Sequence, residues 1–152
     1  METNLKNYTS SVPADKSVSR IERLLVSIGA TNISKQYNDS KLVAISFLVN
    51  VNGNTMPFKL PAKVNVVEKV LKRRTLRPKS DGSTWERIAQ QAERTAWKII
   101  CDWVEIQVSM IKLEQAEVIE IFLPYAYDYK NEKTFFEKLK DGNFAALPQG
   151  TA

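Results

Sequence analysis

The stretch STWERIAQQAERTAWKIICDWVEIQVSMIKLEQAE, residues 83–117, decides how this chain is organised, because it is long and contains neither Gly nor Pro. Its apolar residues recur at alternating intervals of three and four, the spacing of one helix face. This first stripe comprises Trp85, Ile88, Ala92, Ala96, Ile99, Trp103, Ile106, Met110 and Leu113. The pattern predicts one helix, roughly 50 Å long at 1.5 Å per residue.

A second apolar stripe begins at the middle of the same helix. It comprises Trp97, Ile100, Val104, Val108 and Ile111. A helix that is apolar on two faces must be covered on both, so we expect a central buried strut with residues 118–139 folded back over its rear. Ser83 and Glu86 have the spacing of a capping box, which marks its first turn.

The chain before this helix predicts a helix followed by three strands. Residues 1–14 lack an apolar pattern and are interpreted as an extended arm. Asp15 or Ser17 then caps a helix that ends at Gly29. Strands follow over residues 31–37 and 41–51, and Asn52-Gly53 is a favoured two-residue hairpin turn. The inward stripe of the first helix comprises Val18, Ile21, Leu24, Leu25 and Ile28.

The hairpin register can be derived from the turn. Pairing Val51 with Asn54 brings apolar residues opposite one another on one face. The pairs are Val49 with Met56, Phe47 with Phe58, and Ile45 with Leu60. A three-residue turn at 38–40 would likewise set Ile33 opposite Ile45. Pro57 cannot donate to a ladder and therefore predicts an edge strand. The result is an antiparallel meander with residues 41–51 in the middle.

Helical segments surround the long helix on both sides. Pro61 is expected to start a basic helix that ends before Arg77-Pro78. After residue 117 the apolar pattern continues to Pro124, an irregular tyrosine segment follows, and a short helix is expected at 131–140. Together these elements predict an α+β fold with an arm at 1–14, one domain at 15–142 and a tail at 143–152 that is loose apart from Phe144 and Leu147.

The charge of the chain is unevenly distributed. The net formal charge is +5, but residues 59–79 alone carry eight basic groups and one acidic group. Residues 101–141 carry five basic and nine acidic groups. A basic segment beside an acidic one favours binding to an anionic partner or to an acidic protein surface.

Composition also indicates the compartment. The single cysteine, Cys101, excludes an internal disulfide and fits a reducing cytoplasm. Residues 1–13 lack the apolar run of a signal peptide, and no segment approaches the 18 or so apolar residues of a membrane span. We therefore expect a cytoplasmic protein that does not enter a membrane.

The residue types disfavour catalysis. The chain has no histidine, so it lacks the commonest general base and any Cys–His pair. Cys101 is interpreted as a packed helix residue. Asp102 with Glu105, and Glu114, Glu117 and Glu120, have spacings that can hold Mg²⁺ or Ca²⁺, but solvated acidic faces are far commoner. No glycine-rich phosphate loop is present. The sequence thus predicts a non-enzymatic protein with no cofactor and no metal.

The basic segment is the main candidate site. Arginine and lysine side chains on one helix and the following loop can neutralise several phosphates together. The residues are Lys69, Lys72, Arg73, Arg74, Arg77 and Lys79. A charged face that only keeps the protein soluble, or that meets an acidic protein surface, is the alternative. The three tryptophans lie on the apolar stripes and are expected in the core. Tyr125, Tyr127 and Tyr129 are less constrained and form either a lid on the long helix or an exposed, candidate partner-binding patch.

Two resemblances bear on function. The order helix, three strands, helix resembles that of double-stranded-RNA-binding domains, although their lysine-rich motif is replaced here by Pro61-Ala62-Lys63-Val64-Asn65. Several longer strings resemble a family of proteins of unknown function, about 150 residues long, found in phages, prophages and other mobile elements. These strings are YTSSVP (8–13), AISF (44–47), PFKLP (57–61), QAERTAW (91–97), DWVEIQ (102–107) and FLPY (122–125). The resemblance implies a mobile element in a bacterial cytoplasm and supplies no site residue.

Two functions remain open on the sequence alone. The first is binding of DNA or RNA through the basic helix and loop, by phosphate contacts without strong sequence preference. The second is a protein-interaction module, an inhibitor or regulator of a host or phage protein, that uses the long helix and the tyrosine segment. The sequence leaves the oligomeric state undetermined.

Overall fold

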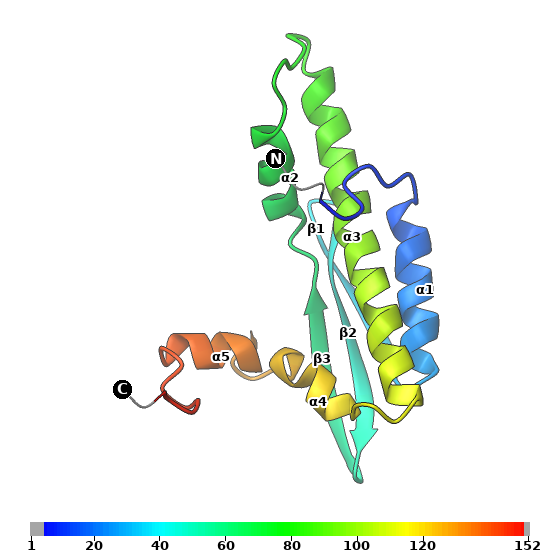
Figure 1. Cartoon of the computed structure of the whole chain (residues 1–152), viewed down its shortest axis with the longest axis vertical. Helices are drawn as coiled ribbons and strands as arrows, with labels where there is room; N and C mark the ends of the chain where they lie inside the picture. Colours follow the sequence, from blue (N-terminus) through cyan, green and yellow to red (C-terminus); the bar gives the residue numbers. More distant parts are fainter. Residues whose placement is uncertain (1–4, 151–152) are drawn as a thin grey trace.

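The computed structural model describes residues 5–150 and has the expected α+β architecture (Figure 1). The helices and strands, in chain order, are α1 (Ala14–Val26), β1 (Thr31–Asn38), β2 (Lys41–Val51), β3 (Asn54–Pro61), α2 (Val64–Arg73), α3 (Ser83–Lys112), α4 (Val118–Phe122), the 3-10 turn η1 (Leu123–Tyr125), β4 (Tyr127–Asp128), β5 (Lys133–Thr134) and α5 (Phe135–Asp141). Within this part of the chain, no helix combines the length and the apolar character that a membrane span requires.

The three-stranded sheet has the order β1-β2-β3, with β2 in the middle and β3 at an edge as Pro57 predicted. The predicted β2–β3 register is confirmed at every pair, from Val51 opposite Asn54 to Ile45 opposite Leu60. Asn52 and Gly53 both have positive φ, as a two-residue turn of this kind requires. The turn and the apolar pattern favour one register, which is why the sequence determines it.

The predicted β1–β2 register is wrong. Ile45 lies opposite Lys35, because the turn contains only two residues, Asp39 and Ser40, and both strands carry irregularities. The irregularity in β2 lies between Leu42 and Ala44, and it allows Leu42 and Ile45 both to enter the core although they are three residues apart. Bulges of this kind have no clear signal in a sequence pattern.

Helix α3 begins at Ser83, but its cap differs from the one predicted. The prediction made the Ser83 side chain the cap. In the structure the Asp81 carboxylate has this role and accepts a hydrogen bond from the Ser83 amide at 3.0 Å. The helix ends at Lys112, five residues before the predicted end. Glu114 has φ 59°, and the Gln115 amide bonds back to the Met110 carbonyl at 2.8 Å, closing the last turn as a Schellman motif.

The helices before α3 follow the apolar pattern but not every predicted boundary. The stop at Gly29 is confirmed, with φ 94° and the next amide bonded to the Leu25 carbonyl at 3.0 Å. Helix α1 starts at Ala14, so Ser17 lies buried inside it instead of capping it. Helix α2 starts at Val64, because Pro61 still pairs with Ala44 as the last residue of β3.

The prediction that α3 is covered on both faces is wrong. The second stripe is buried through Trp97, Val104 and Val108. The first stripe is buried at Ile88, Ala92 and Ala96, and Trp103 is half-buried against the core. The other residues of its C-terminal half face solvent, with Ile106 58% and Leu113 71% exposed. We call this surface the uncovered stripe; it comprises Ile99, Ile106, Met110 and Leu113. Periodicity identifies an apolar face but cannot determine whether another segment reaches it.

The C-terminal segment takes a different course from the one predicted. Phe122 of α4 returns to the core and contacts Phe47, Phe58 and Trp103, with ring centroids 5.5 to 6.0 Å apart. Beyond η1 the chain leaves the body, and α5 extends sideways from the lower end of the sheet (Figure 1). Residues 126–150, which we call the C-terminal arm, therefore do not fold over α3. The short helix within it begins at Phe135 rather than at residue 131.

The tail after residue 142 is held at Phe144, one of the two residues expected to be exceptions to its looseness. The ring of Phe144 lies 6.0 Å from that of Phe136, and the Phe144 amide bonds to the Leu139 carbonyl at 2.7 Å. Residues 151 and 152 of the predicted tail lie outside the described residues.

The N-terminal segment is fixed to α3 over the residues that the structure describes. Thr95 donates to the Asn7 carbonyl at 2.8 Å, and Gln91 and Arg94 both donate to the Ser10 carbonyl. Residues 5–13 are therefore an ordered strap, which the absence of an apolar pattern could not indicate. Residues 1–4 of the predicted arm lie outside the described residues.

Candidate nucleic-acid interface

The six predicted cations all lie on α2 or on the loop 74–82, which forms one end of the molecule beside the start of α3 (Figure 1). Five of them, Lys69, Lys72, Arg73, Arg77 and Lys79, are exposed. Arg74 is half-buried between α2 and α3. The fold thus keeps the basic segment together at one end, which we call the basic end and define as residues 63–90.

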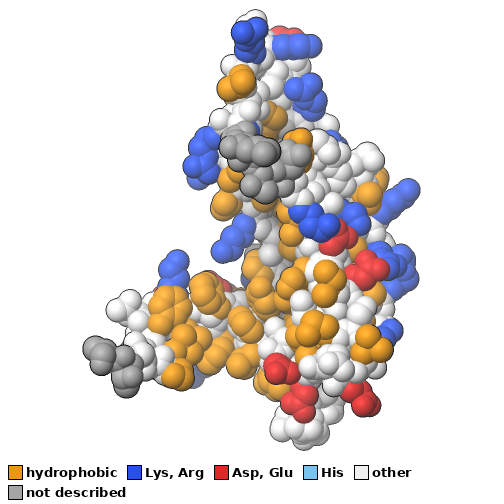
Figure 2. All heavy atoms as spheres, viewed as in Figure 1, with side chains coloured by type: hydrophobic (Ala, Val, Ile, Leu, Met, Phe, Trp, Pro, Cys, Tyr) orange, Lys and Arg blue, Asp and Glu red, His pale blue; other side chains and the backbone are white. Residues whose placement is uncertain are grey.

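The basic end accounts for the net charge of the whole chain. It carries eight Lys or Arg residues and three Asp or Glu residues, a net charge of +5, equal to the net charge of the chain. Figure 2 shows Lys and Arg side chains along the upper part of the molecule, whereas Asp and Glu side chains gather lower down. The basic end also contains two cations outside the predicted six, Lys63 before α2 and Arg87 from the first turns of α3.

Two of the three carboxylates of the basic end, Glu68 and Asp81, make contacts within it. Glu68 lies 3.3 Å from the Lys72 amine and 3.9 Å from the Lys41 amine. Asp81 accepts the Ser83 amide, and these hydrogen bonds lower the pKa of Asp81. Glu68 therefore offsets part of the local positive charge, whereas Lys63, Lys69, Arg73, Arg77, Lys79 and Arg87 are exposed and have no carboxylate partner among the described residues.

Trp85 lies at the basic end and not in the core, contrary to our prediction. Its side chain is 37% exposed, and the Lys72 amine lies 5.7 Å from its ring centroid. Leu76 in the loop is 91% exposed. The first turn of α3 extends beyond the sheet, so the residue that begins the apolar stripe is only partly covered. An exposed aromatic ring among cations is the arrangement on which nucleic-acid bases stack.

The loop itself is held to α3 by its backbone. The buried hydroxyl of Thr84 accepts the Lys79 amide at 2.9 Å, and the Asp81 carboxylate accepts the Ser83 amide. These two bonds position the loop at the start of the helix without using the amine of Lys79. The Lys79 side chain is therefore left exposed for an external anion.

The three tyrosines do not form one patch. Tyr125 packs its ring against Trp103 with centroids 5.8 Å apart and is half-buried. Tyr127 lies under the Lys59 amine, 4.8 Å from it, and meets Tyr129 edge to face at 5.0 Å. Only Tyr129 is largely exposed, at 59%. The turn from η1 into β4 separates Tyr125 from the other two, so their alternate spacing does not place all three together.

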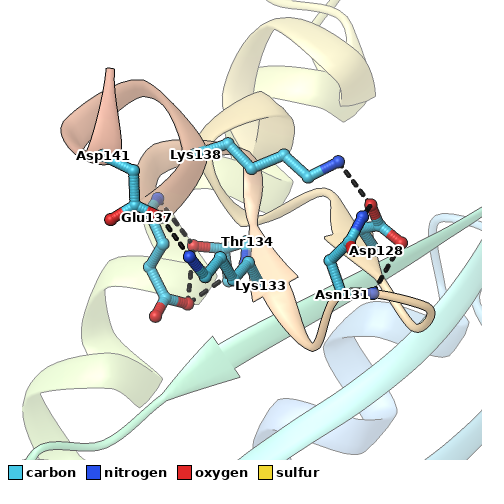
Figure 3. A network of polar contacts seen from close by, with 7 residues as sticks. All are labelled: Asp128, Asn131, Lys133, Thr134, Glu137, Lys138 and Asp141. Carbon is cyan, nitrogen blue, oxygen red and sulfur yellow. Dashed lines mark hydrogen bonds and ion pairs between the residues drawn. The ribbon is translucent and has the colours of Figure 1, made fainter. Parts of the chain in front are cut away.

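The C-terminal arm carries its own polar network (Figure 3). Asp128 pairs with Lys138 and accepts the Asn131 side chain at 2.8 Å, and these contacts hold the pKa of Asp128 far below its usual value. Thr134 and Glu137 form a capping box at the start of α5. Lys133 pairs with Asp141. Most charged groups of the arm are thus engaged within the arm.

Two of the carboxylates considered as metal ligands, Asp102 and Glu105, are engaged in ion pairs. Asp102 accepts Lys98 at 2.8 Å and Asn7 at 2.9 Å, and Glu105 accepts Arg20 at 2.6 Å. Within residues 5–150, no three His, Cys, Asp or Glu side chains converge as a metal site. These contacts connect the N-terminal strap and α1 to α3, so they have a structural role.

Cys101 is buried between the helices, as expected. Burial raises the pKa of its thiol, which lowers the fraction of reactive thiolate near neutral pH.

Replacing Asp102 by asparagine is expected to lower the free energy of unfolding by about 1 kcal/mol at pH 7, because charge-assisted bonds to Lys98 and Asn7 are weakened. Burial tends to raise the pKa of Asp102, but the hydrogen bonds from Lys98 and Asn7 outweigh it, and the pKa is lowered. Because the pKa is lower in the folded state, ionised Asp102 stabilises the fold fully at pH values above its unfolded pKa of about 3.9. This stabilisation is lost as the pH falls through the pKa of the folded state.

Urea denaturation of the native protein and of Asp102→Asn between pH 7 and pH 2 measures the difference in their free energies of unfolding. This difference should shrink below about pH 4. Asp39→Asn, in the exposed turn between β1 and β2, is the matched control and should show no such pH-dependent difference. A difference that stays constant down to pH 2 would contradict the assignment.

Comparison of the chain with protein-family models, curated proteins and solved structures found no match.

Proposed function

We propose that this protein binds nucleic acid at its basic end, through phosphate contacts and without an enzymatic step. The setting that we propose, a phage or other mobile element in a bacterial cytoplasm, comes from the sequence resemblance alone. The observation that carries the proposal is the concentration of charge: a net +5 lies within residues 63–90. Each phosphate neutralised there releases condensed counterions, which is the main driving force of sequence-independent binding.

The arrangement of side chains supports a particular mode of binding. Lys69 and Arg73 project from α2, while Arg77 and Lys79 project from the loop, so a phosphate backbone can contact two separate segments. Arginine donates two parallel bonds to a phosphate, which favours Arg73 and Arg77 as the stronger contacts. Trp85 offers an exposed ring to an unstacked base. A single-stranded segment satisfies both kinds of contact, so we expect it to bind more tightly than a duplex.

The decisive variant removes three exposed cations, Arg73→Gln, Arg77→Gln and Lys79→Gln, and it should weaken oligonucleotide binding about 10- to 100-fold at low salt. This expectation assigns about 0.5 to 1 kcal/mol to each lost phosphate contact. The slope of log affinity against log salt should also fall by about 2 to 3, because three fewer phosphates are neutralised. Fluorescence anisotropy with a labelled single-stranded oligonucleotide across a salt series measures both quantities.

A matched control removes the same charge elsewhere. Arg23, Lys112 and Lys130 are exposed and lie outside the basic end. Their triple replacement by glutamine should change affinity and slope much less than the first variant does. Equal effects of the two variants would show that only the net charge matters. Absence of binding by the native protein at low salt would disprove the proposed function.

A second candidate function is favoured by one specific observation, the uncovered stripe on α3. Exposed apolar residues along one helix face are typical of a surface that meets a partner protein. In this alternative the protein regulates a host or phage protein through the uncovered stripe and the neighbouring tyrosine segment. Failure of oligonucleotide binding would make this the leading function.

A further inference from the structure

A hollow of about 500 Å³ lies next to the basic end, between the N-terminal strap, the end of α2 and the first half of α3. Its floor is apolar and consists of Leu71 and Ile88, both buried in the core. Two arginines, Arg74 from the end of α2 and Arg87 from α3, form its rim. Among the described residues that line it there is no carboxylate.

The strap forms the remaining wall with Tyr8 and Thr9. It is positioned by Gln91, whose amide nitrogen donates to the Ser10 carbonyl at 3.1 Å and whose oxygen accepts Arg94 at 2.6 Å. The hollow is thus built from three segments that are distant in the sequence. The residues that line it could not be identified from the sequence, because the residues of the strap show no apolar periodicity.

The polar groups around the hollow differ in what they still offer. Thr75 already donates to the Leu71 carbonyl at 2.9 Å, and both ends of the Gln91 amide are engaged. Arg87 makes no hydrogen bond or ion pair with any described residue. Among the described residues its five N–H donors have no acceptor, and the exposed Tyr8 and Thr9 line the same hollow. The free donors suit an anion with several oxygens.

The size and the apolar floor indicate more than an isolated anion. A hollow of about 500 Å³ is within the usual range of small-ligand sites and much larger than one phosphate. Leu71 and Ile88 can contact a flat, weakly polar group, and the Tyr8 ring at the rim can pack against its face. A ligand that joins a phosphate to a planar heterocycle matches these features.

We propose that this hollow binds one nucleotide unit of the nucleic-acid strand, with its phosphate on Arg87 and its base against Leu71, Ile88 and Tyr8. This inference rests on the proposed function, since the strand would run from the exposed cations of α2 and the loop into the hollow. Arg87 and Tyr8 are thereby binding residues that the charge pattern of the sequence did not single out.

The test uses adenosine 5′-monophosphate as the probe and the full chain, observed by amide chemical shifts in NMR titrations. Arg87→Gln is expected to weaken binding of the nucleotide about tenfold or more, and Arg87→Lys less, because lysine keeps the charge but loses the bidentate geometry. Tyr8→Ala should weaken binding of the nucleotide but leave binding of inorganic phosphate unchanged. Arg23→Gln, on the exposed surface of α1 and outside the basic end, is the control and should leave nucleotide affinity unchanged.

The outcomes separate this inference from the function on which it rests. Salt-dependent oligonucleotide binding without nucleotide binding, or equal losses of nucleotide affinity for Arg87→Gln and Arg23→Gln, would overturn the hollow as a site and leave the proposed function standing. Nucleotide binding without any oligonucleotide binding would overturn both the function and the assignment of the hollow to a strand. Loss of nucleotide affinity in Arg87→Gln but not in the control, together with oligonucleotide binding by the native protein, supports the inference.

Discussion

Replacing Trp97 by alanine is expected to lower the free energy of unfolding by about 4 kcal/mol or more. The indole is fully buried at the centre of α3, and truncating a core tryptophan typically costs about 3 to 5 kcal/mol through lost burial and the cavity left behind. Its Nε1 also donates to the Leu42 carbonyl at 2.9 Å, joining α3 to β2 beside the bulge. The total free energy of unfolding of a small domain is about 5 to 15 kcal/mol, so the variant should be only marginally stable.

Circular dichroism during urea denaturation measures this loss without depending on tryptophan fluorescence. Trp97→Phe keeps most of the ring but leaves the Leu42 carbonyl without its donor, so it should cost about 1 to 3 kcal/mol. Trp85→Ala is the matched control and should cost less than about 1 kcal/mol, because that ring is partly exposed and contacts Lys72 at the surface. Equal destabilisation by Trp97→Ala and Trp85→Ala would contradict the assigned core.

Replacing Phe122 by alanine is the second large expected effect, a loss of about 3 to 5 kcal/mol. Phe122 is fully buried and is surrounded by Phe47, Phe58 and Trp103. It is the deepest contact between the body and everything that follows α3, where Ala126 adds only an isolated bridge to Phe58. The variant should therefore also release α4 and the C-terminal arm at lower denaturant than the body.

Limited proteolysis reports the second part of this prediction, since cleavage should concentrate in residues 113–125 of the variant. Leu123→Ala is the matched control, because Leu123 is the next residue and is exposed. It should leave both the unfolding midpoint and the cleavage pattern close to those of the native protein. Unchanged proteolysis in Phe122→Ala would show that the arm is held by contacts other than this ring.

The features that could be predicted from the sequence are those determined by neighbouring residues. The β2–β3 register follows from a two-residue turn and a period of two, and both are visible in residues 45–60. The end of α1 follows from Gly29, whose positive φ is accessible to glycine at little cost. The basic end could be predicted for the same reason, since its cations are close in the sequence and occupy one helix and its loop.

The features that could not be predicted depend on which distant segments meet. The same apolar stripe buries Ile88 and exposes Ile106, because the C-terminal arm turns away at η1 and nothing else in residues 5–150 covers that face. Trp85 is exposed because α3 extends beyond the sheet at the basic end. Arg87 and Tyr8 come together only because the strap is hydrogen-bonded along α3.

The sequence by itself determined the α+β class, the hairpin and the position of the charge, since turn geometry, periodicity and net charge are local properties of the chain. Only the tertiary structure decided where the long helix is covered and where a hollow forms beside it. The physical reason is that burial depends on the partner surface as well as on the residue: an apolar stripe is favourable to bury, but it is buried only where another segment packs on it.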